Sequence, residues 1–329
     1  MAPYISVIIP VYGVQEWAER CVSSIMQQTI KDGVEFIFVD DASTDNSLNI
    51  VRDTVCRYPD RIHSVKIISH THNMGLPAAR NTGMSVAQGQ YLFHCDSDDF
   101  LEPDMLRLML NEAVRTDADF VWCDWFLTFG SNERAMRQPA ASTPRQALAD
   151  MLNGSMRYNV WNKLIRRSLF VDNDIHFPDG YAMGEDMTII RIAAKARKVV
   201  HVAKPLYHYI RVNSGAMTQQ YTPARLDALR HNVQLTVDFL HDNIHDSSIE
   251  EEIAWFLLNT KLPFLFTGSK HDISLWQQWY PQANSHILSN KSQSLRTRLL
   301  QWCAAHHLGL VNRLYYNLVF NVFYGKIFK

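Results

Sequence analysis

The chain has 329 residues, of which 47% are hydrophobic and 20% charged, a composition typical of a packed globular protein and not of a disordered one. Its net charge of -1 provides no general attraction for nucleic acid. Five cysteines without paired spacing predict reduced thiols in a cytoplasm instead of a disulfide framework or a zinc site. We also expect no signal peptide and no membrane-spanning segment, because no apolar run has the required form or length.

The first half of the chain alternates short apolar runs with segments of helical spacing. Strands are predicted at 5–11, 36–39, 65–68, 91–95 and 120–125, and helices at 16–28, 46–58, 76–87 and from about 103. This alternation, with fully apolar strands, predicts an α/β fold whose mostly parallel central sheet is covered on both faces. In such sheets ligands bind beyond the carboxyl ends of the strands, so the polar residues that follow each strand are the candidates for a site.

The second half is less regular. From Thr128 to Ala149 the pattern is weak and polar, and we expect an irregular surface stretch there. A strand-like run follows at 206–211, and helix-like, aromatic-rich segments at 225–240, 249–262 and 308–328. We therefore predict two domains, an α/β domain over residues 1–220 and an α-helical C-terminal region over residues 221–329.

An acidic cluster, Asp96-Ser97-Asp98-Asp99, directly follows the fourth predicted strand. Three carboxylates within four residues repel one another in a confined site, and a bound Mg²⁺ or Mn²⁺ would compensate their charge with hard oxygen ligands. The alternative is a solvated acidic turn that caps the helix near Pro103. The residues alone leave both interpretations open.

A second acidic segment, residues 39–45, follows the second predicted strand. A carboxylate there can accept a hydrogen bond from the N–H of a pyrimidine ring. The alternative is capping of the next helix, which we expect of Asp45. Asp40 and Asp41 precede the cap, so capping alone does not explain them.

A third segment, residues 73–81, turns into a helix through Gly75 and Pro77. The N-terminus of a helix is a favourable place for an anion. Arg80 lies one turn inside this helix, where its guanidinium could reach a phosphate or an aspartate.

Taken in order, these segments resemble those of the family-two inverting glycosyltransferases, which have the GT-A fold and build bacterial surface polysaccharides. The resemblance covers roughly residues 4–218 and is carried by segments 6–12, 39–45, 73–81, 96–99, 161–164 and 184–186. It implies a Rossmann-like GT-A fold and transfer of a hexose or N-acetylhexosamine from a UDP-sugar to a saccharide or lipid-linked acceptor. A divalent metal, Mn or Mg, is the implied cofactor.

The resemblance also implies roles for single residues. Asp41 would read the uracil base, with Pro10 and Tyr12 lining the same pocket. On the diphosphate side, Arg80 would help to bind the donor, Asp96 would lie near the ribose and the metal, and Asp98 would be the metal ligand. Asp186 resembles the catalytic base, with Glu185 beside it as the reserve. These site residues are Pro10, Tyr12, Asp41, Arg80, Asp96, Asp98, Glu185 and Asp186.

Three further residues keep two interpretations each. His208 and Arg211 could touch the metal or the diphosphate, or they could be satisfied structural residues. Lys163 could contact a donor or acceptor phosphate, or it could be a scaffold lysine.

Two other functions compete with this one. A sugar-phosphate nucleotidyltransferase would carry a glycine-rich loop with Arg or Lys directly after the first strand. The loop here, residues 12–16, contains no basic residue. A catalytically degenerate sugar-nucleotide-binding scaffold would have lost the acids Asp98 or Asp186, which are both present.

The last predicted helix, residues 308–328, also permits two interpretations. Its aromatic and basic side chains suit peripheral contact with a membrane surface, at the inner face of the cell membrane. However, Val311, Leu314, Leu318 and Val322 fall on one stripe, as core packing would require. Trp276, Trp279 and Trp302 are expected to be packing residues.

Overall fold

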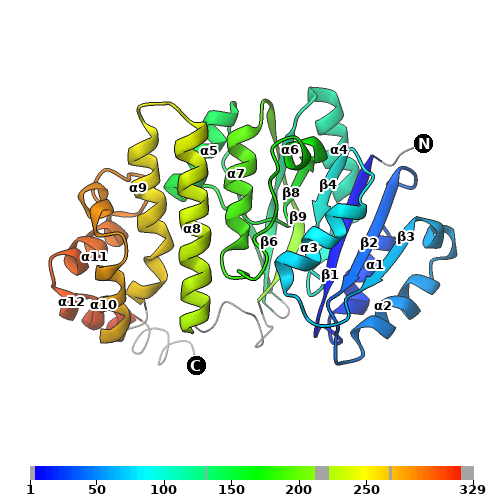
Figure 1. The fold of residues 1–329 in the computed structure, drawn as a ribbon, viewed down its shortest axis with the longest axis horizontal. Helices are drawn as coiled ribbons and strands as arrows, with labels where there is room; N and C mark the ends of the chain where they lie inside the picture. Colours follow the sequence, from blue (N-terminus) through cyan, green and yellow to red (C-terminus); the bar gives the residue numbers. More distant parts are fainter. Residues whose placement is uncertain (1–3, 130–131, 212–221, 267–268, 320–329) are drawn as a thin grey trace. The chain divides into compact units, whose positions relative to one another are not determined.

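The structure is a computed structural model that describes residues 4–129, 132–211, 222–266 and 269–319 (Figure 1). The chain divides into two compact units. Unit 1 comprises Met1–Ala147 and Tyr158–Thr236, and unit 2 comprises Leu148–Arg157 and Val237–Lys329. The chain passes between the units at 147/148, 157/158 and 236/237, and the first and last of these points fall inside helices. The predicted domain boundary at residue 220 lies outside the described residues.

Unit 1 is built on a sheet that contains all the strands found in the described residues. Their order is β3-β2-β1-β4-β8-β6-β9-β5, with β7 paired to β6. The strands are β1 (Ile5–Val11), β2 (Val34–Asp40), β3 (Val65–Ser69), β4 (Tyr91–His94), β5 (Phe100–Leu101), β6 (Phe120–Phe129), β7 (Asn132–Met136), β8 (Lys163–Arg166) and β9 (Val199–Ile210).

The sheet has a parallel part and an inserted antiparallel strand. Strands β1 to β4 pair in parallel, and β6 pairs in parallel with β9. Strand β8 lies between β4 and β6 and runs against both of them. All residues of β1, β2 and β4 are buried, because helices cover both faces of this part of the sheet, as the continuous apolar runs predicted.

The helices connect the strands and form unit 2. They are α1 (Ala18–Met26), α2 (Ser47–Cys56), α3 (Leu76–Val86), α4 (Met105–Thr116), α5 (Pro144–Asn153), α6 (Arg167–Val171), α7 (Thr188–Lys195), α8 (Pro223–Asn243), α9 (Ile249–Thr260), α10 (Lys270–Gln278), α11 (Leu295–Ala305) and α12 (Gly309–Tyr316). No helix within the described ranges is long and apolar enough to cross a membrane.

Helix α3 packs closely on the sheet because of a glycine. A Cβ atom on Gly83 would come within 2.4 Å of Cγ2 of Ile8 in β1, so a larger residue would push the helix away from the strand. Helix α3 also lies across β1 in Figure 1. This close packing fixes the direction in which Arg80, on the same helix, enters the protein.

One prediction for the second half of the chain was wrong. The stretch from Thr128 to Ala149 is not irregular, because β6 continues into it and β7 and the start of α5 lie within it. Strand β7 is almost wholly exposed and is held by its pairing with β6, so it has no hydrophobic pattern of its own.

Candidate active site

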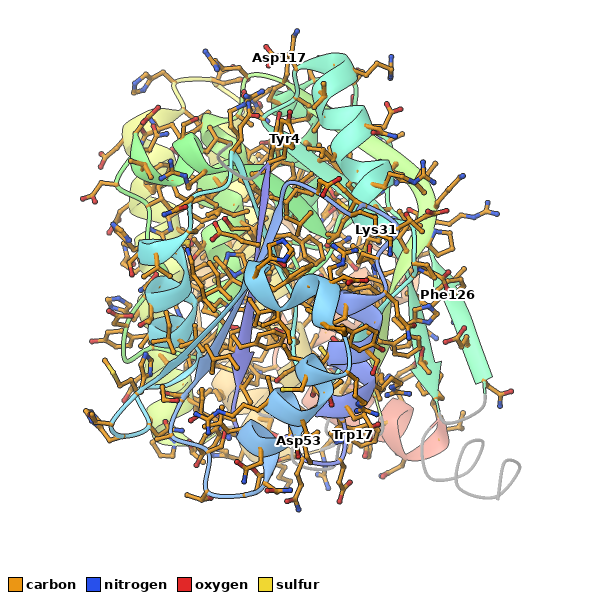
Figure 2. The ribbon with its side chains drawn as sticks, turned by 90° about the vertical axis from the view of Figure 1, so that its right-hand side faces the viewer. Tyr4, Trp17, Lys31, Asp53, Asp117 and Phe126 are labelled. Carbon is orange, nitrogen blue, oxygen red and sulfur yellow. The ribbon has the colours of Figure 1, made fainter. Side chains whose placement is uncertain are left out.

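The candidate residues collect at one edge of the sheet in unit 1. Tyr4, which precedes β1, lies at one end of this unit, and Trp17 and Asp53 lie at the opposite end (Figure 2). Parallel neighbours end at the same edge, so the residues that follow β1, β2, β3 and β4 lie at the end marked by Trp17 and Asp53.

Asp41 follows β2 and is buried at this edge. Its Oδ1 accepts hydrogen bonds from the backbone N–H of Met74 at 2.8 Å and contacts Nδ1 of His70 at 2.7 Å, and its Oδ2 accepts from the N–H of Gly75 at 2.8 Å. Nε2 of His70 lies 2.9 Å from Oγ1 of Thr82. Asp41 therefore fixes the loop that leads into α3.

Asp41 keeps one acceptor position beyond these contacts. A carboxylate has about four, and these contacts with the described residues use three of them. Asp45, by contrast, accepts from the N–H of Ser47 at 3.1 Å at the start of α2, which confirms its predicted capping role.

Pro10 and Tyr12 occupy the neighbouring strand end. Pro10 is buried in β1, paired with Val39 of β2. Tyr12 lies just beyond the strand and is 50% exposed. Its ring is therefore accessible at the edge to which Asp41 belongs.

Arg80 connects two groups of acids. Its side chain is buried, and Nη2 donates to Oδ1 of Asp96 at 2.9 Å. Burial lowers the pKa of Arg80, but the charges of Asp96, Glu185 and Asp186 outweigh this and raise it, so the guanidinium is charged. Of the two partners that the sequence left open, a phosphate or an aspartate, the structure shows the aspartate.

The carboxylates of the acidic cluster after β4 differ in their burial. Asp99 is turned inward, where Oδ2 accepts from the hydroxyl of Tyr207 and Oδ1 from the N–H of Ile210, both at 2.8 Å. Burial raises the pKa of Asp99 well above its usual range. Asp96 and Asp98 are only partly buried. Asp99 therefore ties this segment to β9, and the prediction of a metal at Asp96 and Asp98 does not depend on it.

Glu185 and Asp186 lie in a one-turn helix, Glu185–Met187, just before α7. Burial, followed by the charge of Asp186, raises the pKa of Glu185 to about 8. Burial raises the pKa of Asp186 to about 6, against the opposing effect of Arg80. Burial thus disfavours the ionised form of both acids, and Asp186 is the more exposed of the two.

Lys163 lies beneath these acids at the start of β8. It is buried, and Nζ donates to the carbonyl of Asn159 at 2.8 Å and to Oδ1 of Asn162 at 2.7 Å. Burial lowers its pKa to about 7, and the charge of Asp186 opposes this shift. These contacts favour the scaffold interpretation of Lys163.

The segment that carries Glu185 and Asp186 is held from two sides. Asn81 of α3 donates to the carbonyl of Phe177 at 2.8 Å and accepts from its N–H at 3.0 Å. Asn232 of α8, which is 2% exposed, donates to the carbonyls of Tyr181 and Met183, both at 2.9 Å. No sequence pattern pointed to Asn232, because it lies far along the chain from the residues whose carbonyls it binds.

Gly184 completes this turn. It has a φ of 89°, and a Cβ atom there would come within 3.1 Å of Cδ1 of Leu229 in α8. A larger side chain would thus be strained both by the backbone conformation and by the helix. The glycine lets the two acids begin a new helix directly beside α8.

His208 is a structural residue in this arrangement. Its ring lies between those of Phe100 and Phe126, with centroid distances of 4.0 and 4.7 Å. Nε2 contacts Oε1 of Glu102 at 2.8 Å, and Nδ1 contacts Oε1 of Glu133 at 2.7 Å. Both ring nitrogens are used, which leaves neither for a metal. Arg211 is exposed at the end of the described segment.

His70 is the residue at this edge that the sequence analysis missed. His70 is the first residue after β3, just as Asp41 is the first residue after β2. The rule that polar residues after each strand are candidates would have found it, had it been applied to the third strand as well.

Comparisons with known proteins show the family to which the chain belongs. Residues 6–180 match the sequence profile of Glycosyl transferase family 2. Glycosyltransferase GlyG of Streptococcus pneumoniae serotype 4 is 30% identical over 236 residues, 67% of this chain and 75% of the relative.

Two solved structures share the fold. S. aureus TarS 1–349 has been solved in complex with UDP and in complex with UDP-GlcNAc. Each complex is 18% identical to this chain and superposes with a TM-score of 0.69. The superposition covers 94% of this chain and 88% or 89% of TarS 1–349. Mannosyltransferase PcManGT from Pyrobaculum calidifontis, solved with GDP-Man and Mn²⁺, gives a TM-score of 0.52 at 19% identity, over 96% of this chain and 84% of that one. The chain belongs to glycosyltransferase family 2, has its α/β fold, and is a glycosyltransferase.

Proposed function

We propose that the enzyme transfers a hexose or N-acetylhexosamine from a UDP-sugar to a hydroxyl of a saccharide or lipid-linked acceptor, with inversion, in the synthesis of a surface polysaccharide. The observation that carries this proposal is the arrangement around the buried guanidinium of Arg80, which donates to Asp96 at the end of β4 and lies within reach of the charges of Glu185 and Asp186. TarS, which shares the fold, has been solved with UDP and UDP-GlcNAc, and this supports the choice of donor.

The reaction needs one base. The acceptor hydroxyl attacks C1 of the sugar, the bond from C1 to the diphosphate oxygen breaks, and the hydroxyl proton passes to a carboxylate. Asp186 is partly exposed, whereas Glu185 is buried. The proton acceptor in this proposal is therefore Asp186. Arg80 donates to Asp96, and its charge favours the ionised form of Asp186.

The donor end of the site is proposed to lie at the strand edge. Asp41 would accept from the ring N–H of uracil through its remaining position on Oδ2, and the exposed ring of Tyr12, with Pro10, would line the same pocket. Asp96 and Asp98, at the end of β4, would face the ribose and the diphosphate.

The residues present fit a divalent metal that is bound together with the donor. Asp98 and Asp96 offer hard carboxylate oxygens of the kind that Mn²⁺ and Mg²⁺ prefer. In the described part of the chain, no three His, Cys, Asp or Glu side chains could hold a metal by themselves, so the diphosphate would have to supply the remaining ligands. Bound there, the metal would neutralise charge on the leaving diphosphate.

The experiment that tests the function is a donor screen. The enzyme is incubated with each UDP-, GDP- and dTDP-sugar in manganese, and release of the nucleotide is measured. UDP release from a UDP-sugar is the expected result. Release from GDP-sugars alone would contradict the proposed donor, and binding without any turnover would favour the degenerate scaffold. The nucleotidyltransferase alternative is excluded by the family assignment.

We expect Asp41→Ala to weaken UDP binding by about tenfold or more, since a hydrogen bond to a charged group contributes about 1.5–3 kcal/mol. Calorimetry with UDP, and with pyrophosphate as the control ligand that lacks the base, measures this. If Asp41 only fixes the loop at Met74 and Gly75, both ligands will lose affinity equally. Unchanged UDP affinity with an intact fold would leave Asp41 a structural residue.

We expect Asn232→Ala to lower kcat by about tenfold or more, because small displacements of a catalytic group have large effects on rate. The Kd for UDP should stay within about twofold of native, since both hydrogen bonds that the Asn232 side chain donates within the described residues go to the segment that carries the base. Asn243→Ala is the control on the same helix, where Nδ2 donates to the carbonyl of Phe239. Equal losses in both variants, or a matching loss of UDP affinity, would mean that Asn232 supports the fold only.

The enzyme is proposed to work in the cytoplasm. A lipid-linked acceptor would bring it to the inner face of the cell membrane, so peripheral contact with that surface forms part of the proposal.

A further inference from the structure

Two neighbouring helices of unit 2 carry large apolar side chains that are exposed to solvent. On α11, Leu295, Leu299 and Trp302 recur at helical spacing and are all exposed. On α12, Leu310 is 66% exposed and Leu314 is 59% exposed. The full exposed set is Leu295, Leu299, Trp302, Leu308, Leu310, Val311, Leu314 and Leu318.

The exposure of these residues disagrees with the packing interpretation of the helix predicted at 308–328. Val311, Leu314 and Leu318 were candidates for a core stripe, but the structure leaves them 44%, 59% and 56% exposed, while Val322 lies outside the described residues. The packing interpretation holds for Trp276 and Trp279, which are buried, and not for Trp302. Large apolar side chains gathered in exposed positions are typical of a surface that binds a protein or a membrane.

The two helices lie against each other. Figure 1 shows α11 and α12 side by side, and Asn312 of α12 donates to the carbonyl of Leu300 in α11 at 3.0 Å. The guanidinium of Arg296 lies over the ring of Tyr315, 5.8 Å from its centroid. The exposed stripes thus belong to one helical pair, which we call the α11–α12 surface.

The charge of this part of the sequence indicates what the surface contacts. No Asp or Glu follows Asp272 in the sequence, whereas six basic residues do: Lys291, Arg296, Arg298 and Arg313 within the described residues, and Lys326 and Lys329 outside them. The whole chain has 32 Lys and Arg against 33 Asp and Glu, so residues 1–272 have 26 against 33. The basic excess is therefore confined to the segment that carries the exposed apolar side chains.

From this combination we infer that the α11–α12 surface docks the enzyme on an anionic lipid bilayer. Apolar side chains enter the acyl boundary while Lys and Arg meet the acidic headgroups. A second copy of the chain fits less well, since a symmetric pair would bring two basic surfaces of the same sign together. The inference deepens the proposed function, because it gives a lipid-linked acceptor a route to the enzyme.

The test uses the full chain and vesicles of defined composition. Sedimentation with vesicles of phosphatidylglycerol and phosphatidylcholine should retain the native protein, and vesicles of phosphatidylcholine alone should retain much less. The double variant Leu310→Asp, Leu314→Asp should bind anionic vesicles about tenfold or more weakly. The matched control is Val114→Asp, Val171→Asp, at two apolar residues of unit 1 that are 61% and 62% exposed. Its binding should be native.

Three results would overturn the inference. They are failure of the native chain to bind either vesicle, equal binding by both double variants, and a native dimer that the Leu310, Leu314 variant converts to a monomer in sedimentation velocity. Thermal unfolding of each variant checks that the fold is intact. UDP release from the donor, measured in solution on the same samples, separates loss of docking from failure of the proposed reaction.

Discussion

Asp186→Asn is expected to lower kcat by about 10²-fold or more, while the Kd for UDP stays close to native. The amide keeps the size of the carboxylate but cannot accept the proton of the acceptor hydroxyl. Single-turnover kinetics gives the rate of transfer, and calorimetry with UDP gives the affinity. Measured together, they distinguish a catalytic base from a residue that binds the donor.

Two controls sharpen this experiment. Asp172→Asn changes an exposed aspartate earlier in the same region and should leave turnover native. The pH profile of the native enzyme should fall below about pH 6, where Asp186, whose pKa is raised to about 6, becomes protonated and can no longer act as a base. If Asp186→Asn keeps its turnover while Glu185→Gln loses it, the base is Glu185, and if both keep it, the base lies elsewhere.

The second large effect is expected for Asp98→Ala, which should lower transfer by about 10²-fold or more and weaken UDP binding in manganese. Without this ligand the diphosphate charge is poorly neutralised as the bond to the sugar breaks. The measurements are transfer rate and UDP affinity, each with manganese and with EDTA.

The matched control for this prediction is Asp53→Ala, an exposed aspartate on α2 at the same end of unit 1 (Figure 2). It should behave as native in every condition. Near-native transfer by Asp98→Ala, or a native enzyme that EDTA does not affect, would contradict the metal assignment.

The fold was predictable where burial leaves a pattern in the sequence. Strands β1 and β2 are buried along their whole length, and their continuous apolar runs predicted a covered parallel sheet. Strand β8 was not predicted, because its four residues are too few to show a period and include Lys163 and Arg166. What makes it a strand is pairing with β4 and β6, which local sequence does not reveal.

The site was predictable in position more than in detail. The rule for strand ends located Asp41 and Asp96, and the resemblance added Asp186. Side-chain direction could not be read from spacing. Asp98 and Asp99 are adjacent, yet Asp99 points inward and accepts from Tyr207, 108 residues further along the chain. Contacts of this kind depend on the folded chain, and so do those of Asn232.

The hydrogen bonds from α8 to the segment before Glu185 affect how far the chain can be truncated from its C-terminal side. Every site residue named from the sequence lies before position 220, and the family profile ends at residue 180. A chain shortened after residue 220 would keep all those side chains. It would nevertheless lose Asn232, and with it the two hydrogen bonds that anchor Tyr181 and Met183. We therefore expect a chain shortened after residue 220 to lose activity even though it keeps every site residue named from the sequence.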